Sequence, residues 1–503
     1  MSVRLVIFSL WDWRWITTAL VFVVTYFVGS FYHKVSKYPR GPFPLPLVGN
    51  LLTLSKVKYL HCEATEWSKK YGDVFTLWMS HKPMVFLNGH KAIREALLDR
   101  RIDFAGRFPT KLGALQNQGD HDILFEDYTP RWKALRKVFH LAVRKYAISE
   151  ALERLCTEVV DSYVDSLQHG PQLIDSRKPS FHILYKLVGA SVYGTEMDNE
   201  SEDIRRLEEI DDEFHSLFPN GLPSDVAPLL AVVYRRREKK IETIFREATE
   251  IFRGLFVKAK ATYVPGSTDN FTHAMLTARE EAISEEKGDA QYLTEGNMVL
   301  LLRNIFGGAT DTSAGELHWL FLRMIKEPRI QEKIQKEIDD NIGSAPPVYK
   351  DRAKCPFTVA CLLETLRCYP ILPLSFPHKT TKDTRVGEVF IPKDTGAFYN
   401  AYGGNHDPKI WDDPEEFRPE RFIDPATGNL REDAEPLLTF GMGSRTCPGE
   451  KLAHVDMFYI VVRLMQRLSF TAPADQSGVK LDGAASSLIM QPVKQNIVLT
   501  RKD

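Results

Sequence analysis

The sequence is poor in cysteine and carries almost no net charge. Only six of its 503 residues are cysteines, scattered at positions 62, 156, 355, 361, 368 and 447. They form no Cys-x-x-Cys pair and no dense disulfide framework of the kind found in small secreted domains, so we expect a reducing, cytosol-facing compartment. The 65 basic and 66 acidic residues give a formal net charge of −1. No global electrostatic field therefore favours nucleic acid as a partner.

Internal repeats, low-complexity tracts and nucleotide-binding motifs are absent as well. No Gly-x-Gly-x-x-Gly sequence follows a predicted strand, which excludes a dinucleotide or flavin module of the usual kind within the chain. The length alone would allow two or three domains, but no convincing linker follows Asn50.

An uncharged apolar run near the N-terminus predicts a membrane anchor. The run from Trp15 to Tyr32 is about as long as a membrane-spanning helix and has aromatic residues at both ends. A cleaved signal peptide is the main alternative, but its apolar region is usually shorter. Lys34, Lys37 and Arg40 follow the run, so we expect the C-terminal side to face the cytosol.

A proline-rich segment follows the predicted anchor. Four prolines between Tyr38 and Asn50 disfavour a helix and favour a stiff extended spacer. We therefore divide the chain into a membrane anchor over residues 1–33, a proline-rich hinge over 34–58 and a catalytic domain over 59–503.

The remaining sequence predicts a mostly α-helical fold with a small β-sheet region. Short apolar runs at Val74–Trp78, Pro83–Leu87 and Gly396–Tyr399 predict strands. Apolar residues recur at helical spacing in eight longer segments, namely His61–Lys70, Arg94–Asp99, Pro130–Val143, Ser149–Gln168, Arg235–Lys260, Thr294–Ile325, Arg329–Ile342 and Thr358–Tyr369.

A glycine-rich loop presents one cysteine just before a predicted helix. The loop is Phe440–Gly449, and Pro448 suits the first helical position after Cys447. Unpaired N–H groups at a helix N-terminus favour a thiolate over a thiol, and glycines leave room for a large flat group. A lone cysteine in a long chain is more often a buried structural residue. Here, however, Cys447 belongs to a ten-residue pattern.

That pattern, Phe-x-x-Gly-x-Arg-x-Cys-x-Gly, resembles the haem-ligand loop of the cytochrome P-450 family. The resemblance implies a cytochrome P-450 fold with a single catalytic domain behind a transmembrane helix. It also implies haem b, with its iron bound by Cys447, a propionate bound by Arg445, and Phe440 packed near the sulfur. The sequences Asp127–Lys133 and Pro377–Asp383 are most similar to those of animal microsomal members, the steroid 17-alpha-hydroxylases and polycyclic-aromatic hydroxylases.

Four further residues are expected at the haem propionates. Arg107, Trp132, Arg136 and His378 stand where members of the resembled family place propionate-binding groups. Taken alone, the arginines would be read as solvated charges and the tryptophan as a core residue. Guanidinium groups can bind carboxylates bidentately, and an indole N–H can donate one bond.

The predicted helix Thr294–Ile325 carries a second motif. Two adjacent glycines in its centre cost about 1 kcal/mol each relative to alanine and need a packing or functional reason. Thr312 can hydrogen-bond to the carbonyl four residues earlier, and the Asp311–Thr312 pair could relay protons to dioxygen. The motif resembles the family's acid-threonine signature, with Ala309 where glycine is commoner.

Glu364 and Arg367 lie three residues apart on one predicted helical face, a spacing that is often only a surface ion pair. Together with Arg421 they resemble the family's Glu-x-x-Arg motif and its partner arginine. The resemblance implies a buried structural network, in which loss of one partner would typically cost about 3–5 kcal/mol.

By analogy with the same family, the substrate pocket should be lined by residues that are small or apolar. The expected lining residues are Ile305, Gly308, Ala309, Leu372, Leu374, Leu488 and Ile489. A lipophilic substrate, either steroid-like or an aromatic xenobiotic, fits such a lining.

The resemblance as a whole implies a membrane-bound haem-thiolate monooxygenase of the endoplasmic reticulum, facing the cytosol. It would hydroxylate its substrate with O2 and with electrons from NADPH, delivered by a separate reductase, with cytochrome b5 as a second candidate donor. Lys133, Lys137, Arg144 and Lys145 form a candidate docking patch for the reductase, or they are ordinary solvated charges. The alternatives are a haem-thiolate isomerase or dehydratase, and a non-catalytic haem-binding sensor.

Overall fold

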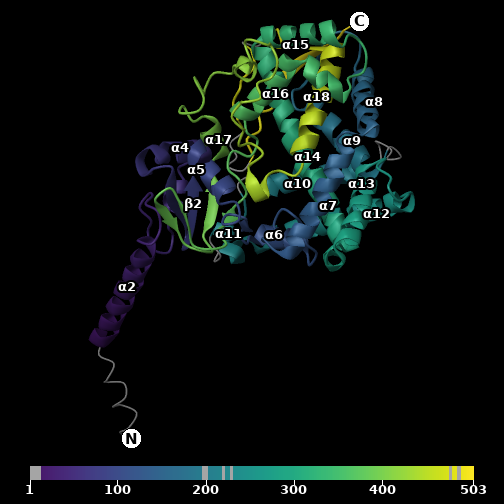
Figure 1. Cartoon of the computed structure of the whole chain (residues 1–503). Coiled ribbons are helices and arrows are strands. Elements are labelled where there is room, and N and C mark those ends of the chain that lie inside the picture. The colour runs from purple at the N-terminus through teal and green to yellow at the C-terminus, as the bar shows by residue number, and fades with distance from the viewer. Residues whose placement is uncertain are drawn as a thin grey trace.

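The computed structural model describes residues 13–194, 202–217, 221–226, 230–474, 478–483 and 489–502, and in this part of the chain it is mostly α-helical (Figure 1). The α-helices that build the body and the anchor are α2 (Trp13–Val35), α3 (Leu51–Leu54), α4 (Leu60–Tyr71), α5 (His90–Arg94), α6 (Lys111–Asn117), α7 (Pro130–Tyr146), α8 (Glu150–Ser166), α9 (Lys178–Tyr193), α10 (Glu202–Leu217), α11 (Pro223–Val226), α12 (Ala231–Ala261), α13 (Phe271–Glu285), α14 (Glu295–Lys326), α15 (Pro328–Asn341), α16 (Pro356–Cys368), α17 (Ala401–Asn405) and α18 (Glu450–Arg467).

The strands form small sheets. The five-stranded sheet has the order β1 (Val74–Met79), β2 (Lys82–Leu87), β8 (Gly396–Tyr399), β5 (His378–Lys379) and β3 (Gly106–Arg107). The others join β4 (Gln172–Asp175), β10 (Asn496–Arg501) and β9 (Leu468–Thr471), and β6 (Thr384–Val386) with β7 (Val389–Ile391). This composition confirms the expected mostly helical fold with a small sheet region.

Two local expectations differ from the structure. The expected helix over residues 94–99 is the end of α5 followed by a π-helical turn, Glu95–Asp99. Helices α9, α10 and α13 were not expected. Most of α9 is buried, as is the first half of α13, so neither shows the one-sided apolar pattern of a surface helix.

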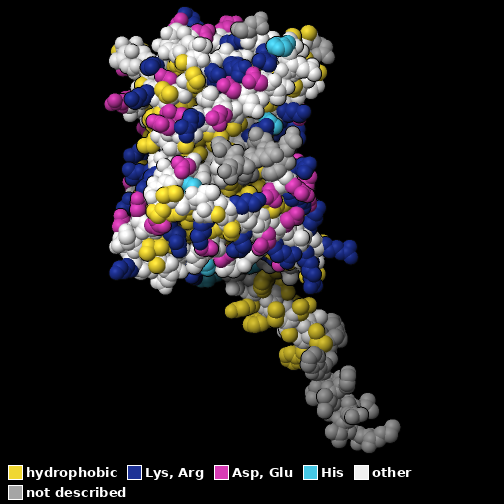
Figure 2. Space-filling model, turned by 90° about the vertical axis from the view of Figure 1, so that its right-hand side faces the viewer, with side chains coloured by type: hydrophobic (Ala, Val, Ile, Leu, Met, Phe, Trp, Pro, Cys, Tyr) yellow, Lys and Arg dark blue, Asp and Glu magenta, His cyan; other side chains and the backbone are white. Residues whose placement is uncertain are grey.

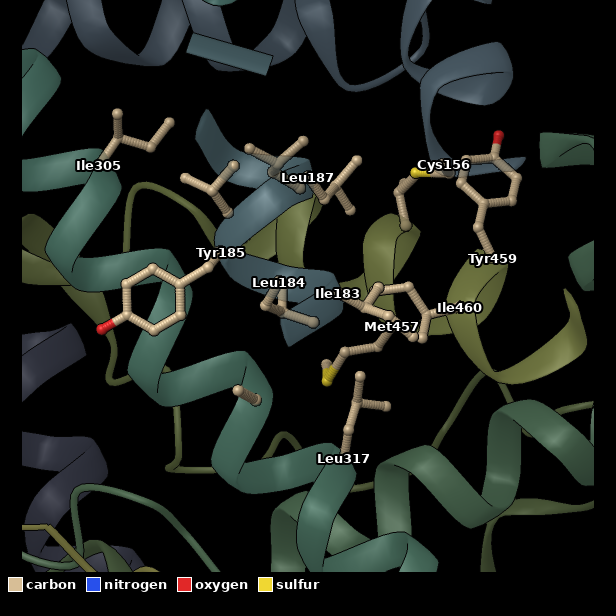
Figure 3. Packing of buried hydrophobic residues seen from close by; sticks show 14 of the residues in the cluster. Cys156, Ile183, Leu184, Tyr185, Leu187, Ile305, Leu317, Met457, Tyr459 and Ile460 are labelled. Atoms are coloured by element: carbon tan, nitrogen blue, oxygen red, sulfur yellow. The ribbon is translucent and has the colours of Figure 1, made fainter. Parts of the chain in front are cut away.

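Helix α14 runs through the centre of the main apolar core. It packs against α9 on one side, and α18 lies beside both of them (Figure 3). Leu184 and Leu187 of α9, Leu317 of α14, and Met457 and Ile460 of α18 belong to one buried cluster. Residues of the middle of α14 are thereby held rigidly in the interior of the molecule.

Helix α2 projects from the body at the end where the five-stranded sheet lies (Figure 1). Its segment Trp15–Val35 has a mean hydropathy of 1.6 and, by length and composition, is the one candidate membrane span among the described residues. Figure 2 shows apolar side chains gathered on the projecting part, below a body whose surface is rich in charge. Such an exposed apolar helix would be unfavourable in water.

The base of α2 is docked on the sheet. The Phe31 ring is 8% exposed and lies 5.4 Å from the Trp78 ring, while Tyr32 stacks on Phe43 at 5.4 Å. The proline-rich segment also folds against β1, because the Asn50 side chain accepts a hydrogen bond from the Trp78 N–H at 2.7 Å. The segment is therefore part of the folded body and not a free spacer.

Candidate functional site

Cys447 lies just before α18 and is reached by a short 3-10 turn, Gly443–Arg445. The helix begins at Glu450, two residues later than the sequence suggested, with Gly449 as its N-cap. The backbone N–H groups of Gly449 and Glu450 still hydrogen-bond to the Cys447 sulfur. The Cys447 N–H donates to the carbonyl of Phe440 at 2.7 Å, which closes the loop.

The glycines of this loop serve tight packing more than open space. Gly443 has a φ of +67°, and a Cβ atom there would lie 1.8 Å from the carbonyl oxygen of Leu97. At Gly441, with a φ of +68°, a Cβ atom would lie 2.7 Å from the Tyr399 hydroxyl. The expectation that these two glycines make room for a flat group is thus wrong, because both positions are filled by protein atoms.

Burial raises the pKa of Cys447 above its usual value, although the N–H groups of Gly449 and Glu450 and the charge of Arg136 act in the opposite direction. The thiolate is therefore not favoured by the helix start alone, contrary to expectation. A cation bound at the sulfur would reverse this balance, since metal coordination deprotonates a thiol.

Three guanidinium groups surround the loop, those of Arg107 and Arg136 being buried and that of Arg445 half-buried. Arg445 donates to the carbonyls of Ala105 at 2.7 Å and Glu126 at 2.9 Å, and its guanidinium lies 4.0 Å from the centre of the Trp132 ring. Burial, followed by the charges of Arg107 and Arg136, lowers the pKa of Arg445 to about 8.

The other two arginines are bound mainly by carbonyl oxygens. Arg136 donates to the carbonyl of Thr446, and Arg107 donates to that of Phe376 at 3.3 Å. Burial lowers the pKa of each to about 10. Among the described residues none of the three forms an ion pair with a carboxylate, and the Arg107 Nε has no hydrogen-bond partner. Three neighbouring cations of this kind require an anion, which the carboxylates of a haem would supply.

Trp132 and His378 meet this cluster differently from what the sequence suggested. The Trp132 Nε1–H donates to the carbonyl of Ile123 at 3.0 Å, so the ring and not the N–H faces the cluster. His378 Nδ1 lies 2.8 Å from the carbonyl of Phe104, and burial, followed by the Arg107 charge, lowers its pKa to about 3. A neutral His378 that donates from Nδ1 keeps only an acceptor, and an adjacent anion would raise its pKa and allow donation.

The middle of α14 has an open face inside the protein. Gly307 and Gly308 are exposed, and a Cβ atom at either would meet no described atom within 4 Å. The Thr312 hydroxyl donates to the carbonyl of Gly308 at 2.5 Å, the four-residue back-bond that the sequence predicted. Asp311 is buried and lies near Tyr185. The pKa of the Tyr185 phenol is raised mainly by burial, then by the charge of Asp211 and then by that of Asp311.

Glu364, Arg367 and Arg421 lie together in a buried network. Arg367 binds both carboxylate oxygens of Glu364, at 2.8 and 2.9 Å, and neither side chain is exposed. Arg421 Nε donates to the same carboxylate at 3.0 Å, as does the Arg418 N–H at 2.8 Å. The carboxylate thus has donors on both oxygens.

The residues expected to line the pocket are not all on one surface. Ile305 and Ala309 lie on α14 within or against the main core. Leu372 and Ile489 pack against a smaller cluster formed by Trp319, Ile371 and Met490.

Leu374 instead packs with Phe75 and Phe86 on the five-stranded sheet, apart from the other expected lining residues. Leu374 also pairs with Asn400 next to β8, a backbone register that the sequence does not reveal. Leu488 lies outside the described residues.

The candidate docking patch is largely engaged within the protein. Lys137 pairs with Glu285 at 2.9 Å, and Lys145 pairs with Glu281 at 2.6 Å, both on α13. Lys133 lies over the Tyr128 ring at 4.7 Å. Both are surface ion pairs at partly exposed lysines, and Arg144 is exposed, so the four residues remain a candidate docking patch.

Two residues of the site were missed from the sequence. Tyr399 of β8 places its hydroxyl beside Gly441, and burial raises the pKa of this phenol, with Cys447 contributing. Asp122 is fully buried among the residues between α6 and α7 and lies near the arginine cluster. Neither carries a local sequence signal, because both are brought to the site by contacts between distant segments.

Comparisons with known proteins agree with this geometry. Residues 39–499 match the family described as Cytochrome P450. Cytochrome P450 1A1 of Limanda limanda is 30% identical over 469 residues, which cover 90% of this chain and 89% of the relative. Steroid 17-alpha-hydroxylase/17,20 lyase of Capra hircus is 27% identical over 476 residues, covering 92% and 93%. A solved structure of a zebra fish cytochrome P450 with progesterone matches with a TM-score of 0.77 and 27% identity, over 88% of this chain and 99% of the other.

The match spans the anchor-proximal hinge, the open face of α14 and the cysteine loop. The residues around that loop fit a haem, because they offer one thiol together with three arginines, two buried and one half-buried, that form no ion pair with a carboxylate among the described residues. The N-terminal helix is a candidate anchor of the kind that microsomal members carry. This chain therefore belongs to the cytochrome P450 family and is a haem-dependent monooxygenase.

Proposed function

We propose that this enzyme hydroxylates a lipophilic, steroid-like or aromatic substrate on the open face of α14. The observation that carries the proposal is the exposure of Gly307 and Gly308 in the centre of an otherwise buried helix, one turn from Thr312. Glycine at the centre of a helix is unfavourable, so its presence beside open space indicates that a cofactor and a substrate approach the backbone there.

The residue roles follow from chemistry and position. Cys447 would hold the haem iron, while Arg107, Arg136 and Arg445 would bind the propionates. When bound, the haem activates dioxygen and delivers one oxygen atom to a C–H bond of the substrate. The protein has to position the substrate, exclude bulk water and supply protons.

Thr312 and Asp311 are the proposed proton carriers. The Thr312 hydroxyl can turn from the Gly308 carbonyl towards the open face and donate its proton there. Asp311 is buried on the neighbouring face, near Tyr185, and can return a proton to the threonine through water. Ala309 leaves this face more open than a larger residue would.

A lipophilic substrate is supported by the apolar side chains of Ile305 and Ala309, which flank the two glycines on α14. Steroids are the first compounds to test, because one relative is a steroid 17-alpha-hydroxylase/17,20 lyase and one similar structure contains progesterone. Aromatic xenobiotics are the second class.

We further propose that electrons come from NADPH through a separate reductase, with cytochrome b5 as a second donor. The enzyme is proposed to be anchored in the endoplasmic reticulum membrane with its catalytic domain facing the cytosol. The exposed apolar surface of α2 and the basic residues Lys34, Lys37 and Arg40 after it support this orientation.

The test is reconstitution of the full chain in lipid vesicles with haem, NADPH and a cytochrome P450 reductase. We expect O2-dependent hydroxylation of a steroid or an aromatic probe, no product without the reductase, and no product from Cys447→Ser. Product formed without O2 and NADPH would instead support the isomerase or dehydratase alternative. Full haem loading without any product, across both probe classes, would support the haem-binding sensor.

A further inference from the structure

A polar cluster that the proposed chemistry does not use lies beside the open face of α14. The Asp122 carboxylate is fully buried and accepts hydrogen bonds from the N–H groups of Phe125 at 2.8 Å and Glu126 at 3.3 Å. It also accepts from the side-chain amides of Gln116 at 3.4 Å, Asn117 at 3.3 Å and Asn304 at 3.4 Å. Three amide side chains are therefore gathered around one carboxylate, two of them from asparagines.

Asp122 fixes the orientation of the side-chain amides of Asn117 and Asn304. A carboxylate that receives this many donors acts only as an acceptor, so each amide must turn its NH2 group towards it. The carbonyl oxygens of Asn117 and Asn304 consequently point elsewhere. Both oxygen atoms are buried, and neither has a hydrogen-bond partner among the described residues. Buried polar atoms are nearly always satisfied by protein, water or a ligand, so these two acceptors require a donor.

The position of Asn304 relates this cluster to the reaction. Asn304, Gly308 and Thr312 are spaced by four residues and therefore lie on one face of α14. At a rise of about 1.5 Å per residue, Asn304 lies about 12 Å from Thr312 along the helix axis. The neighbouring residue of Asp122, Ile123, accepts hydrogen bonds from Trp132 and Arg445. The cluster therefore borders the same site from two directions.

The charges and hydrogen-bonding atoms of the cluster determine which functional group of a ligand it can bind. Arg303 directs its guanidinium at the Thr249 hydroxyl, at 2.6 Å, and at the carbonyl of Gln116, at 2.7 Å. The atoms left over are the carbonyl oxygens of Asn117 and Asn304, beside the carboxylate of Asp122. A carboxylate or a ketone would find no donor there, whereas a hydroxyl group could donate its proton to one of these acceptor oxygens.

We propose that Asn304 and Asn117 form a subsite for a hydrogen-bond donor at the far end of an elongated lipophilic substrate. The donor is a hydroxyl group, and the carbon that is oxidised lies about 12 Å away, opposite Thr312. This inference rests on the proposed hydroxylase function and narrows its substrate class to hydroxylated, rigid apolar molecules. It excludes free fatty acids bound by their carboxylate at this end.

Equilibrium dialysis on the haem-loaded full chain, without NADPH, tests the subsite directly. The probes are androstane with a terminal hydroxyl, methoxy or keto group, and chrysene with a terminal hydroxyl, methoxy or acetyl group, the acetyl group being the keto counterpart. We expect the hydroxyl compound of at least one scaffold to bind about ten-fold tighter or better than its methoxy and keto counterparts, because only the hydroxyl donates. Equal binding of the three groups on both scaffolds, including failure to bind either scaffold, overturns the proposal and leaves a water as the partner.

Variants separate the subsite from general damage. Asn304→Leu and Asn117→Leu should each remove most of the hydroxyl preference while the affinity for the methoxy compound stays the same. Asn341→Leu, at an exposed asparagine on α15, should keep the preference. The carbon-monoxide spectrum of the reduced protein reports whether each variant still holds haem. If both Leu variants retain the preference, the subsite assignment is wrong.

The two proposals fail in different ways. A chain that selects the hydroxyl probes but forms no oxygenated product refutes the proposed function and keeps the subsite. A chain that hydroxylates either scaffold without any preference refutes the subsite and keeps the function.

Discussion

Two threonines of α14 make the same local hydrogen bond in different surroundings. Thr310 donates to the carbonyl of Phe306 at 2.8 Å and is 1% exposed, whereas Thr312 lies on the open face. We expect Thr312→Val to lower turnover about 100-fold, the usual contribution of a positioned proton donor, with little change in substrate affinity. Thr310→Val is the matched control and should leave turnover nearly unchanged. An equal loss in both variants would show that the effect comes from helix geometry. Steady-state rates and dialysis provide the two readouts.

The buried carboxylate of Glu364 gives a second prediction for a single residue. Glu364→Gln leaves the cations of Arg367 and Arg421 without their counter-charge in a buried site, so the free energy of unfolding should fall by about 3–5 kcal/mol. Urea unfolding of the haem-loaded protein measures this loss. Arg431→Gln, which removes a fully solvated partner of Asp433, should leave the unfolding curve unchanged. A loss as small as that of the control would contradict a structural role for the network.

Single residues differ in how far the sequence could place them. Glu364 and Arg367 share a helical face by their spacing alone, but only the resemblance to a family suggested Arg421 as their partner. The side chain of Leu374 depends on the pairing of its segment with the chain after β8, and the hydrogen bond of Trp132 depends on a loop that precedes its own helix. Such contacts between distant segments leave no periodic pattern in the sequence.

At the scale of one element, the two glycines that leave α14 with an open face also lower the stability of this helix. Gly308→Ala should raise the stability of the haem-free protein by up to about 1 kcal/mol, because alanine favours a helix and the space is open. Gly308→Leu should fill that space and lower haem content or substrate affinity. Gly254→Ala on α12, also beside open space, should stabilise without affecting either. Calorimetry and the haem absorption spectrum measure these effects. Normal ligand binding in Gly308→Leu would contradict the placement of the site.

Most of the long helices were predicted from the spacing of their apolar residues, including the largely buried α14, whereas α9, α10 and α13 were missed. The expected helices over residues 130–143, 149–168 and 294–325 correspond to α7, α8 and α14 within a few residues. The largely buried α9 and the first half of α13 lack the contrast between a buried and an exposed face that reveals a surface helix. The start of α18 was placed two residues early, because Pro448 is compatible with both a turn and a first helical turn.

For the whole molecule, buried histidines predict instability in acid. Burial lowers the pKa of His61, His140, His318, His406 and His454 to about 4, and that of His378 to about 3. In the unfolded chain these groups titrate near about 6.5, so the unfolded state binds more protons between the two values. Their contribution to stability is present above about pH 6.5 and is lost as the pH falls towards 4. Circular dichroism melts across this range should show a steadily falling melting temperature, and a flat profile would contradict the burial.

The anchor offers a prediction at the same scale. A form starting at residue 30 and a form starting at residue 36 should both leave the membrane fraction, since both lack most of α2. Only the form starting at residue 36 lacks Phe31, whose buried ring packs against Trp78 in the full chain. The loss of this contact should lower the free energy of unfolding of that form by about 2 kcal/mol. Phe22→Ala, at an exposed position of α2, should not affect the stability of the full chain in detergent. Equal stability of the two truncated forms would show that the docking contact contributes nothing.

The docked base of α2 also determines how the enzyme meets its substrate. A body joined to its anchor through stacked rings and a folded hinge cannot swivel freely above the lipid headgroups. Its tilt and height over the bilayer are then constant properties of the polypeptide. Hydrophobic compounds dissolved in the membrane would therefore meet the body of the enzyme at one fixed depth in the bilayer, and their orientation within the lipid leaflet would influence which end of the molecule is bound first.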